Sequence, residues 1–436
     1  MPLRLEWSGS ARLDRFQGDA VVLGKGLIVR QRSLIAITAA LAAGALTLTA
    51  CGSRDSGGKG SDSKGGTTVV IGVDAPLTGD LSAIGLGIKN SVDLAVKQAN
   101  KQKVVDGVTF KMEPLDDQAQ PSSGQQNASK LVSESDVLGV VGPLNSSVAE
   151  SMQKVFDDAK LVEVSPANTN PALTQGANWQ TKKARAYKAY FRTATTDAIQ
   201  GPFAAQYVYG KAKKKKVFVI DDKKTYGAGL AATFTDEFKK LGGTVAGTEH
   251  INPDTKDYSA VATKVKNSGA DVVYYGGEYP QAGPLSKQIK AAGANIPVVG
   301  GDAIYDPTYI KLAGAASNGD LATSVGAPLD QLPSAKDFLA NYKAGGYNEE
   351  YGAYGGYAYD SAWAIIQAVK QVVSNGKVPS DARSKITAAM QNVSFDGVTG
   401  KVSFDEFGDT TNKQLTVYSV TGGAWKTVTS GTYNGG

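Results

Sequence analysis

Short apolar runs alternate with amphipathic stretches along the chain from residue 67 onward. The run TVVIGV at 68–73 is continuously apolar and bounded by polar residues, which predicts a buried strand. Over 84–100 apolar side chains recur every three or four residues, the spacing of a helix with one buried face. Further strands are expected at 108–115, 137–142, 161–166, 216–221, 243–251, 271–277, 296–301, 400–405 and 414–420. Further helices are expected around 128–132, over 147–159, from 227, over 258–267, up to 292, over 353–374 and over 382–392.

Strands and helices that alternate in this way favour α/β domains with mainly parallel sheets, because a parallel strand needs a crossover to reach its neighbour. The pattern runs through two successive stretches of the chain, so we expect two such domains. In sheets of this kind, ligands bind at the carboxyl ends of strands, next to helix N-termini. The residues directly after the predicted strands are therefore the candidate site residues.

Polar side chains follow two predicted strands in the first half of the chain. Asn145 and Ser146 lie in VVGPLNSSVAESM, where a strand ends and a helix begins, and Asn168 and Thr169 lie in VSPANTNPALT. Hydroxyl groups and free backbone N–H groups at a helix start form a natural anion site. The alternative role for these side chains is plain helix capping.

Two acids occupy the corresponding positions in the second half. Glu278 in YYGGEYP and Asp302 in VVGGDAIYD each follow a Gly-Gly pair at the end of a predicted strand. Anion-binding tips in one half that face acids in the other half would suit a zwitterionic ligand.

Composition excludes several classes of protein. The formal net charge is +5, but six basic and three acidic residues lie in 1–50, so the rest of the chain is nearly neutral and gives no reason to expect a nucleic-acid partner. His250, in TEHINPD, is the single histidine, and with one cysteine in the chain it offers neither a zinc site nor a Ser–His–Asp triad. We therefore expect a protein that is not an enzyme and holds no metal or cofactor.

The N-terminal segment has the parts of an export signal. Arg30 and Arg32 precede eighteen uncharged residues at 33–50, eight of them Ala or Gly, which is weakly apolar for a permanent membrane span. The segment ends in LTAC, which is similar to the bacterial lipobox, where cleavage before the cysteine accompanies attachment of a diacylglycerol to its thiol. We expect a signal peptide at 1–50, with translation starting near Val29, and a lipid anchor on Cys51.

The residues after Cys51 predict a tether. The stretch 52–66 contains six Gly and four Ser, so it cannot bury enough apolar surface to offset its ordering entropy. Residues 51–66 are therefore expected to link a lipidated cysteine flexibly to the folded part. The mature protein would then be exported and held at the outer face of the cytoplasmic membrane.

Eight motifs in one order carry a family resemblance: APLTGDLSAIG, DDQAQP, VVGPLNSSV, SPANTNPALT, FRTATTDAIQGP, DDKKTYGAGLA, DVVYYGGEYPQAG and KVSFDEFGD. With them, the chain from Val69 to Lys426 resembles the branched-chain amino-acid-binding proteins of ABC importers. The resemblance implies a type I periplasmic-binding-protein fold, in which two doubly wound parallel-sheet lobes are joined by three hinge crossovers and close on the ligand. Lobe 1 is expected at 67–195 plus 325–403, and lobe 2 at 196–324 plus 404–430.

The same resemblance implies a site for an amino acid in the cleft. Ser146 and Thr169 match the hydroxyl residues that hold the α-carboxylate of the ligand. The backbone at Leu144 and Ala167 lines the same site, and the Ala167 carbonyl is placed to accept from the ammonium group. Asn145 and Asn168 flank these positions and are included in the predicted site.

The second lobe supplies the ammonium end of the implied site, and two positions depart from the family pattern. Asp302 matches the acidic ammonium partner, which is usually Glu, and Tyr226 matches an aromatic residue that lines the cleft. Ile84 stands where leucine-type binders carry a Tyr beside the ligand side chain, and Glu278 stands where they carry a Tyr that helps to bind the ammonium. Either the ligand carries an added donor or positive charge, or Glu278 pairs with a cation of the protein.

The resemblance implies partners as well as a ligand. We expect a monomer that delivers an amino acid, branched-chain or related, to the permease and ATPase subunits of an ABC importer. The same fold leaves open a short-chain amide, urea or a polar or basic amino acid as ligand, and a role as a ligand sensor.

Overall fold

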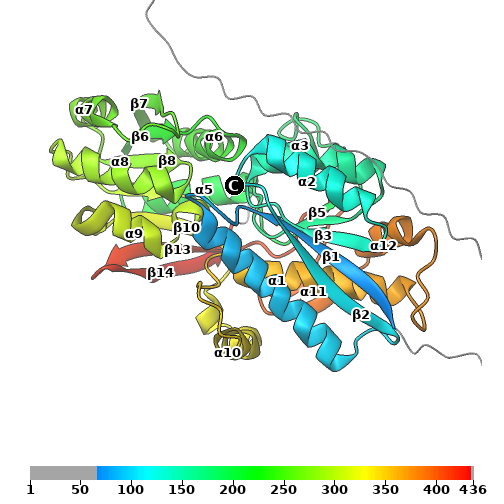
Figure 1. The fold of residues 1–436 in the computed structure, drawn as a ribbon. Helices are drawn as coiled ribbons and strands as arrows, with labels where there is room; N and C mark the ends of the chain where they lie inside the picture. The colour runs from blue at the N-terminus through cyan, green and yellow to red at the C-terminus, as the bar shows by residue number, and fades with distance from the viewer. Residues whose placement is uncertain (1–65, 434–436) are drawn as a thin grey trace, which may run out of the picture. The chain divides into compact units, whose positions relative to one another are not determined.

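The computed structural model describes residues 66–433, and within them two sheets define two lobes (Figure 1). Lobe 1 is built on a five-stranded sheet with the order β2-β1-β3-β4-β5, and lobe 2 on a seven-stranded sheet with the order β14-β13-β10-β9-β8-β6-β7. The strands of lobe 1 are β1 (Thr67–Ala75), β2 (Val108–Asp116), β3 (Val137–Val141), β4 (Glu163–Ser165) and β5 (Tyr190–Arg192). The strands of lobe 2 are β6 (Lys216–Asp221), β7 (Thr244–His250), β8 (Val272–Gly276), β9 (Val298–Gly300), β10 (Leu321–Val325), β13 (Gln414–Thr421) and β14 (Ala424–Thr432).

Helices cover both faces of each sheet. In lobe 1 they are α1 (Ser82–Gln102), α2 (Pro121–Ser133), α3 (Ser146–Asp158), α4 (Ala172–Gln175), α10 (Lys336–Ala344), α11 (Gly355–Val372) and α12 (Ala382–Met390). In lobe 2 they are α5 (Asp197–Gln206), α6 (Thr225–Lys240), α7 (Ser259–Ser268), α8 (Tyr279–Ala291) and α9 (Pro307–Ala313). In Figure 1, α2 and α3 lie on one side of the lobe 1 strands, and α1 and α11 lie on the other. A hairpin of β11 (Ser394–Gly397) and β12 (Gly400–Ser403) lies apart from both main sheets.

Strand β6 shows why the central strands read as continuous apolar runs. Successive side chains of a strand point to opposite faces of the sheet. Val217 and Val219 pack in the cluster that contains α5 and α6, whereas Phe218 and Ile220 pack in the cluster that contains α7 and α8. Because both faces are covered, the four central positions of the strand, 217–220, are all apolar.

The prediction of doubly wound, mainly parallel sheets is confirmed, with one difference at the edge of lobe 2. Strand β1 runs parallel to β2 and β3, and β6 runs parallel to β7 and β8. Strand β13 pairs antiparallel with β10, and β14 extends the same edge antiparallel to β13. The sequence pattern misses β14 because its residues are mostly exposed and show no apolar run.

Between residues 66 and 433 the chain passes from one lobe to the other three times: after β5, after β10 and after β12. The exact lobe boundaries stay a prediction. The predicted signal peptide, Cys51 and nearly all of the tether lie outside the described residues. Within the described part of the chain, no helix combines the length and the apolar character needed to cross a membrane.

Candidate ligand-binding site

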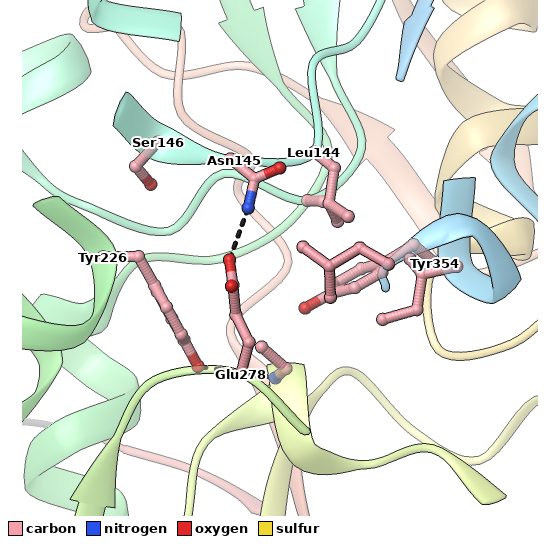
Figure 2. Close-up of a pocket in the computed structure, with 10 residues that line it drawn as sticks. Leu144, Asn145, Ser146, Tyr226, Glu278 and Tyr354 are labelled. Atoms are coloured by element: carbon pink, nitrogen blue, oxygen red, sulfur yellow. Dashed lines mark hydrogen bonds between the residues drawn. The ribbon is translucent and has the colours of Figure 1, made fainter. Parts of the chain in front are cut away.

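A small cavity lies where the two lobes meet, and both lobes line it (Figure 2). Lobe 1 contributes Leu81, Ile84, Leu144, Asn145, Ser146, Ala167 and Tyr354, and lobe 2 contributes Tyr226, Glu278 and Ala303. The centre of a water molecule can move through about 20 Å³ of this space, which is room for about one water. A ligand of the size of an amino acid can therefore enter only when the lobes move apart or the lining side chains shift.

The turn between β3 and α3 brings three of the lining residues into the cavity. Gly142 adopts a φ of 136°, and a Cβ there would lie 2.1 Å from the Asp74 carbonyl oxygen, so the turn requires glycine. Leu144, Asn145 and Ser146 follow at once, and α3 begins at Ser146. The first N–H groups of a helix lack partners within it and carry a partial positive charge, which favours an anion at this point.

Two polar atoms of this turn are buried without a partner in the part of the chain that the structure describes. Ser146 Oγ and Asn145 Oδ1 make no hydrogen bond to any described residue, although Ser146 is 2% exposed and Asn145 is 7% exposed. A buried polar atom without a partner costs about 1–3 kcal/mol. Because both residues line the cavity, a bound polar group is the natural way to satisfy them.

Glu278 reaches across the cavity from lobe 2 (Figure 2). Its Oε1 accepts a hydrogen bond from Asn145 Nδ2 in lobe 1, and its Oε2 lies 2.7 Å from Lys224 Nζ. Burial alone would lower the pKa of Lys224, but the nearby carboxylates, first Glu278 and then Asp222, together raise it, so Lys224 keeps its positive charge. The sequence leaves two explanations for Glu278 open: an added donor or positive charge on the ligand, or a cation of the protein. The structure shows the second, because Glu278 pairs with Lys224.

Asp222 adds a second acid beside this pair. It is buried, its Oδ1 accepts from the Lys224 backbone N–H at 3.0 Å, and its Oδ2 has no partner among the described residues. Burial, and then the nearby charge of Glu278, raise the pKa of Asp222 to about 7.

Asp302 lies behind the cavity wall rather than in it. Its Oδ1 accepts from Tyr226 Oη at 2.8 Å and from Gln200 Nε2 at 2.9 Å, and its Oδ2 accepts from Tyr354 Oη at 2.7 Å. Burial raises its pKa, and these donors oppose that shift. The described residues that line the cavity include Tyr226 and Tyr354 but not Asp302, whose predicted contact with the ligand stays a prediction.

Asn168 and Thr169 are also buried and are not among the described residues that line the cavity. The Asn168 side chain donates to the Leu144 carbonyl at 2.7 Å, so it fixes the neighbouring turn. Thr169 Oγ1 donates to Asp197 at 3.0 Å. Their predicted contacts with the ligand stay predictions, and Ala167, just before them, does line the cavity.

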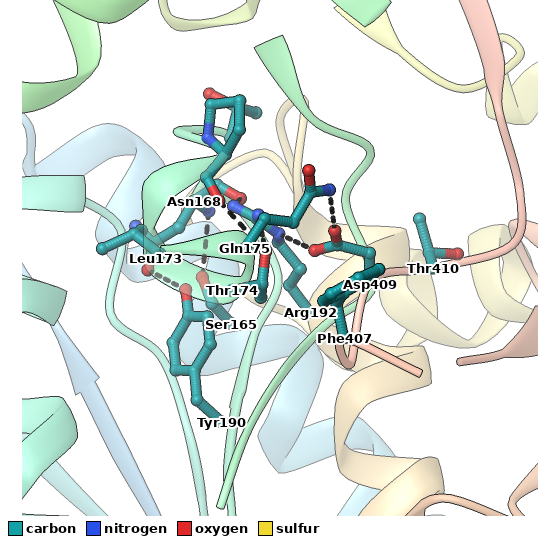
Figure 3. Close-up of polar contacts among 12 residues, drawn as sticks. Ser165, Asn168, Leu173, Thr174, Gln175, Tyr190, Arg192, Phe407, Asp409 and Thr410 are labelled. Atoms are coloured by element: carbon teal, nitrogen blue, oxygen red, sulfur yellow. Dashed lines mark hydrogen bonds and ion pairs between the residues drawn. The ribbon is translucent and has the colours of Figure 1, made fainter. Parts of the chain in front are cut away.

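A buried arginine, Arg192, holds the loop between β4 and α4 (Figure 3). Arg192 Nε lies 2.6 Å from Asp409 Oδ1, and its Nη1 donates to the carbonyls of Asn168 at 3.1 Å and Asn170 at 2.7 Å. Its Nη2 donates to Thr174 Oγ1 at 2.5 Å. These bonds hold the backbone of the loop between β4 and α4 in place, and they therefore determine the position of Ala167, which the same loop carries.

Several residues of the site are not predicted from the sequence. Leu81, Ala303 and Tyr354 line the cavity, and Lys224 pairs with Glu278, yet none of these four residues directly follows a predicted strand. The one available signal for Lys224 is the pair of lysines at 223–224, between the motif residues DD and TYGAG. His250 is half-exposed and lies 2.8 Å from Asp221, and the described residues contain no group of three or more side chains suited to a metal ion.

Over residues 66–433, two α/β lobes, three passages of the chain between them and a small cavity at their junction define a two-lobe ligand-binding protein. The chain belongs to the periplasmic binding protein family, whose sequence profile matches residues 68–424. It is 31% identical over 373 residues to the Leu/Ile/Val-binding protein homolog 2 of Brucella abortus, covering 85% of this chain and 94% of that protein. It is 30% identical over 355 residues to the Leu/Ile/Val-binding protein BraC3 of Rhizobium johnstonii, covering 80% and 91%.

Solved structures agree with this assignment. The leucine binding protein LivK of Thermotoga maritima matches with a TM-score of 0.74 and 26% identity over 83% of this chain and 98% of that one. The substrate binding protein LivJ of Streptococcus pneumoniae, solved in complex with isoleucine, matches with a TM-score of 0.73 and 26% identity over 84% and 99%. The predicted type I fold is therefore confirmed. The relatives are binding proteins, in agreement with the expectation that the chain is not an enzyme.

Proposed function

We propose that this chain is the extracytoplasmic substrate-binding component of an ABC importer and that it binds an aliphatic, branched-chain amino acid in the cavity between its lobes. One observation carries the proposal. Ser146 Oγ is buried at the N-terminus of α3 with no hydrogen-bond partner among the described residues, and it faces a cavity whose remaining walls are largely apolar. Relatives named for leucine, isoleucine and valine binding support an aliphatic ligand.

The chemistry of the cavity suits a zwitterion with an apolar side chain. The ligand carboxylate would meet Ser146 and the first N–H groups of α3, and the side chain would lie against Leu81, Ile84 and Leu144. Hydrogen bonds to charged groups contribute about 1.5–3 kcal/mol each, so a few of them support a Kd on the order of micromolar. The ammonium group needs a carboxylate, and there are two candidates: Asp302, which matches the acidic residue of the family, and Glu278, which departs from the family pattern.

Transport would use the closure of the lobes. Since the cavity has room for about one water molecule, the ligand would enter a more open form and the lobes would then close on it. The closed, loaded protein, acting as a monomer, would dock on the permease, which works with its ATPase subunits. We also propose that lipidated Cys51 and the tether keep the protein at the membrane surface.

Calorimetry with the purified protein tests the ligand class. Leucine, isoleucine or valine should bind with a Kd on the order of micromolar, and Ser146→Ala should weaken binding about 10- to 100-fold through loss of one charge-assisted hydrogen bond. Ser147→Ala is the matched control, because Ser147 is adjacent in α3 but does not line the cavity among the described residues. Binding of acetamide or urea in place of every amino acid would refute the proposal.

The anchor has its own test. Mass spectrometry of the protein from membranes should find an acylated N-terminal Cys51, and Cys51→Ala should move the protein to the medium. An intact segment before Cys51 in the mature protein would refute the anchor and leave the ligand assignment untouched.

A further inference from the structure

The two candidate acids differ in whether a ligand can reach them. Asp302 is 0% exposed, and both of its oxygens already accept hydrogen bonds from side chains. The phenols of Tyr226 and Tyr354, which line the cavity, make two of those bonds. A ligand ammonium could approach Asp302 only by displacing them.

Glu278 is open to the cavity where Asp302 is closed off. It lines the cavity, and its carboxylate lies between Asn145 of lobe 1 and Lys224 of lobe 2 (Figure 2). An ionised carboxylate offers about four lone-pair sites. Asn145 and Lys224 use one donor each, so Glu278 retains capacity for a further donor.

The Asn145 amide supplies a second acceptor at the same place. Because its Nδ2 donates to Glu278, its Oδ1 must point away from that carboxylate, and this Oδ1 is the buried atom without a partner among the described residues. An ammonium group has three donors and no acceptor. A ligand ammonium beside Glu278 would therefore satisfy Asn145 Oδ1 as well.

The neighbouring residue fixes the other end of the ligand. Ser146 follows Asn145 directly and begins α3, so an anion site and an acceptor pair lie side by side on the cavity wall. In an α-amino acid the carboxylate and the ammonium are attached to one carbon atom. That short spacing fits Ser146 and the adjacent acceptors of Asn145 and Glu278. It fits Ser146 and Asp302 less well, because the phenols of Tyr226 and Tyr354 cover Asp302.

We propose that Glu278, together with Asn145 Oδ1, binds the ammonium group of the ligand, and that Asp302 is a positioning residue that holds Tyr226 and Tyr354. The assignment rests on the proposed function, because it concerns an amino-acid ligand in this cavity. Lys224 neutralises Glu278 in the empty site, so the cavity accepts one ammonium group without favouring a second positive charge on the ligand side chain.

Ligands that lack one charged group can show whether Glu278 or Asp302 binds the ammonium group. Calorimetry compares leucine with isocaproate, which lacks the ammonium group, and with leucinamide, which lacks the carboxylate. Glu278→Gln should weaken leucine and leucinamide about 10- to 100-fold while isocaproate changes little. Lys224→Gln should strengthen the binding of leucine and leucinamide, since it removes the cation that competes with the ligand ammonium for Glu278.

Asp302→Asn and Asn145→Ala complete the set. Asp302→Asn should lower the Tm and weaken leucine and isocaproate by a similar factor, because it loosens two wall residues. Asn145→Ala removes no helix cap, since the Asn145 side chain caps no N–H of α3, and it should repeat the ammonium-selective loss even if Glu278→Gln fails to fold.

Two results would overturn the assignment: equal loss of leucine and isocaproate in Glu278→Gln and Asn145→Ala, or an ammonium-selective loss in Asp302→Asn. If the unmodified protein binds neither leucine nor its derivatives, the proposed function itself fails, and the assignment fails with it. Binding by the unmodified protein with the wrong selectivity in the variants refutes the assignment alone.

Discussion

Arg192 and Asp409 form a buried ion pair in which the Nε and Oδ1 atoms lie 2.6 Å apart, although 217 residues separate them in the chain. Arg192 ends β5 in lobe 1, and Asp409 lies in the passage from β12 to β13. The same guanidinium holds the loop before α4. One buried cation therefore joins a wall of the cavity to a segment that must move when the lobes open.

Breaking this pair should cost more stability than any surface pair. Asp409→Asn leaves the Arg192 charge buried and uncompensated, and the loss of one partner of a buried ion pair costs about 3–5 kcal/mol. Urea unfolding of the variant measures this loss. Asp158→Asn is the control, because its pair with Lys154 is exposed on α3 and should contribute little. Equal midpoints for the two variants would contradict the prediction.

Asp197 predicts how stability depends on pH. Burial, and then the nearby Asp302, raise the pKa of Asp197 to about 8. The unfolded chain loses this proton near pH 4 while the folded chain keeps it, so the free energy of unfolding falls as pH rises from about 4 to 8. Asp197→Asn should flatten part of that fall, because the amide resembles the protonated acid.

The measurement for Asp197 is the Tm at several pH values between 5 and 8. Thr169 and Gln200 both bond this side chain, and the Thr169 hydroxyl can turn to accept from the new amide. Asp302 keeps its own contribution, so the slope should shrink without vanishing. An unchanged slope in Asp197→Asn would show that another group sets it.

Gly85 predicts a steric limit in α1. A Cβ at this position would lie 1.9 Å from the Pro76 carbonyl oxygen, which is backbone and cannot turn aside. Gly85→Ala should therefore destabilise the protein by about 3 kcal/mol and weaken ligand binding, because Leu81 and Ile84 on the same turn line the cavity. Gly210→Ala is the matched control, since nothing lies within 4 Å of its Cβ, and its Tm should hold or rise.

Ile84 predicts the size of the ligand side chain. It is buried in the cavity wall, so Ile84→Ala widens the space and removes contacts worth about 2 kcal/mol from a leucine side chain. Leucine should bind about 30-fold more weakly, and phenylalanine should gain relative to leucine. Ile88→Ala is the control: Ile88 is buried one turn further along α1, so its loss should lower the Tm without changing the order of ligands.

The sequence predicts the lobes well because most central strands are buried on both faces and most helices have one apolar face. It predicts the turn at Leu144–Ser146 for the same reason, since a strand that ends at a helix N-terminus is visible in the pattern. It cannot distinguish Glu278 from Asp302, because both follow Gly-Gly at a strand end, and the difference lies in which side chain the phenols of Tyr226 and Tyr354 cover.

Ion pairs between residues far apart in the chain are a second feature that the sequence does not predict. Lys224 meets Glu278 across 54 residues and Arg192 meets Asp409 across 217, and no local pattern marks either pair. Strand β5 is three residues long and ends in the buried Arg192, so no apolar run marks it in the sequence.

The small size of the cavity, with room for about one water molecule, has a kinetic consequence. A bound amino acid leaves when the lobes part or the lining side chains shift, so its residence time is set by how often these motions occur rather than by how many contacts it makes. Ligands that differ in affinity would then leave at similar rates when they hold the lobes together equally well. A permease that pulls the lobes apart would shorten this residence time without touching the ligand, and cargo release would be coupled to docking.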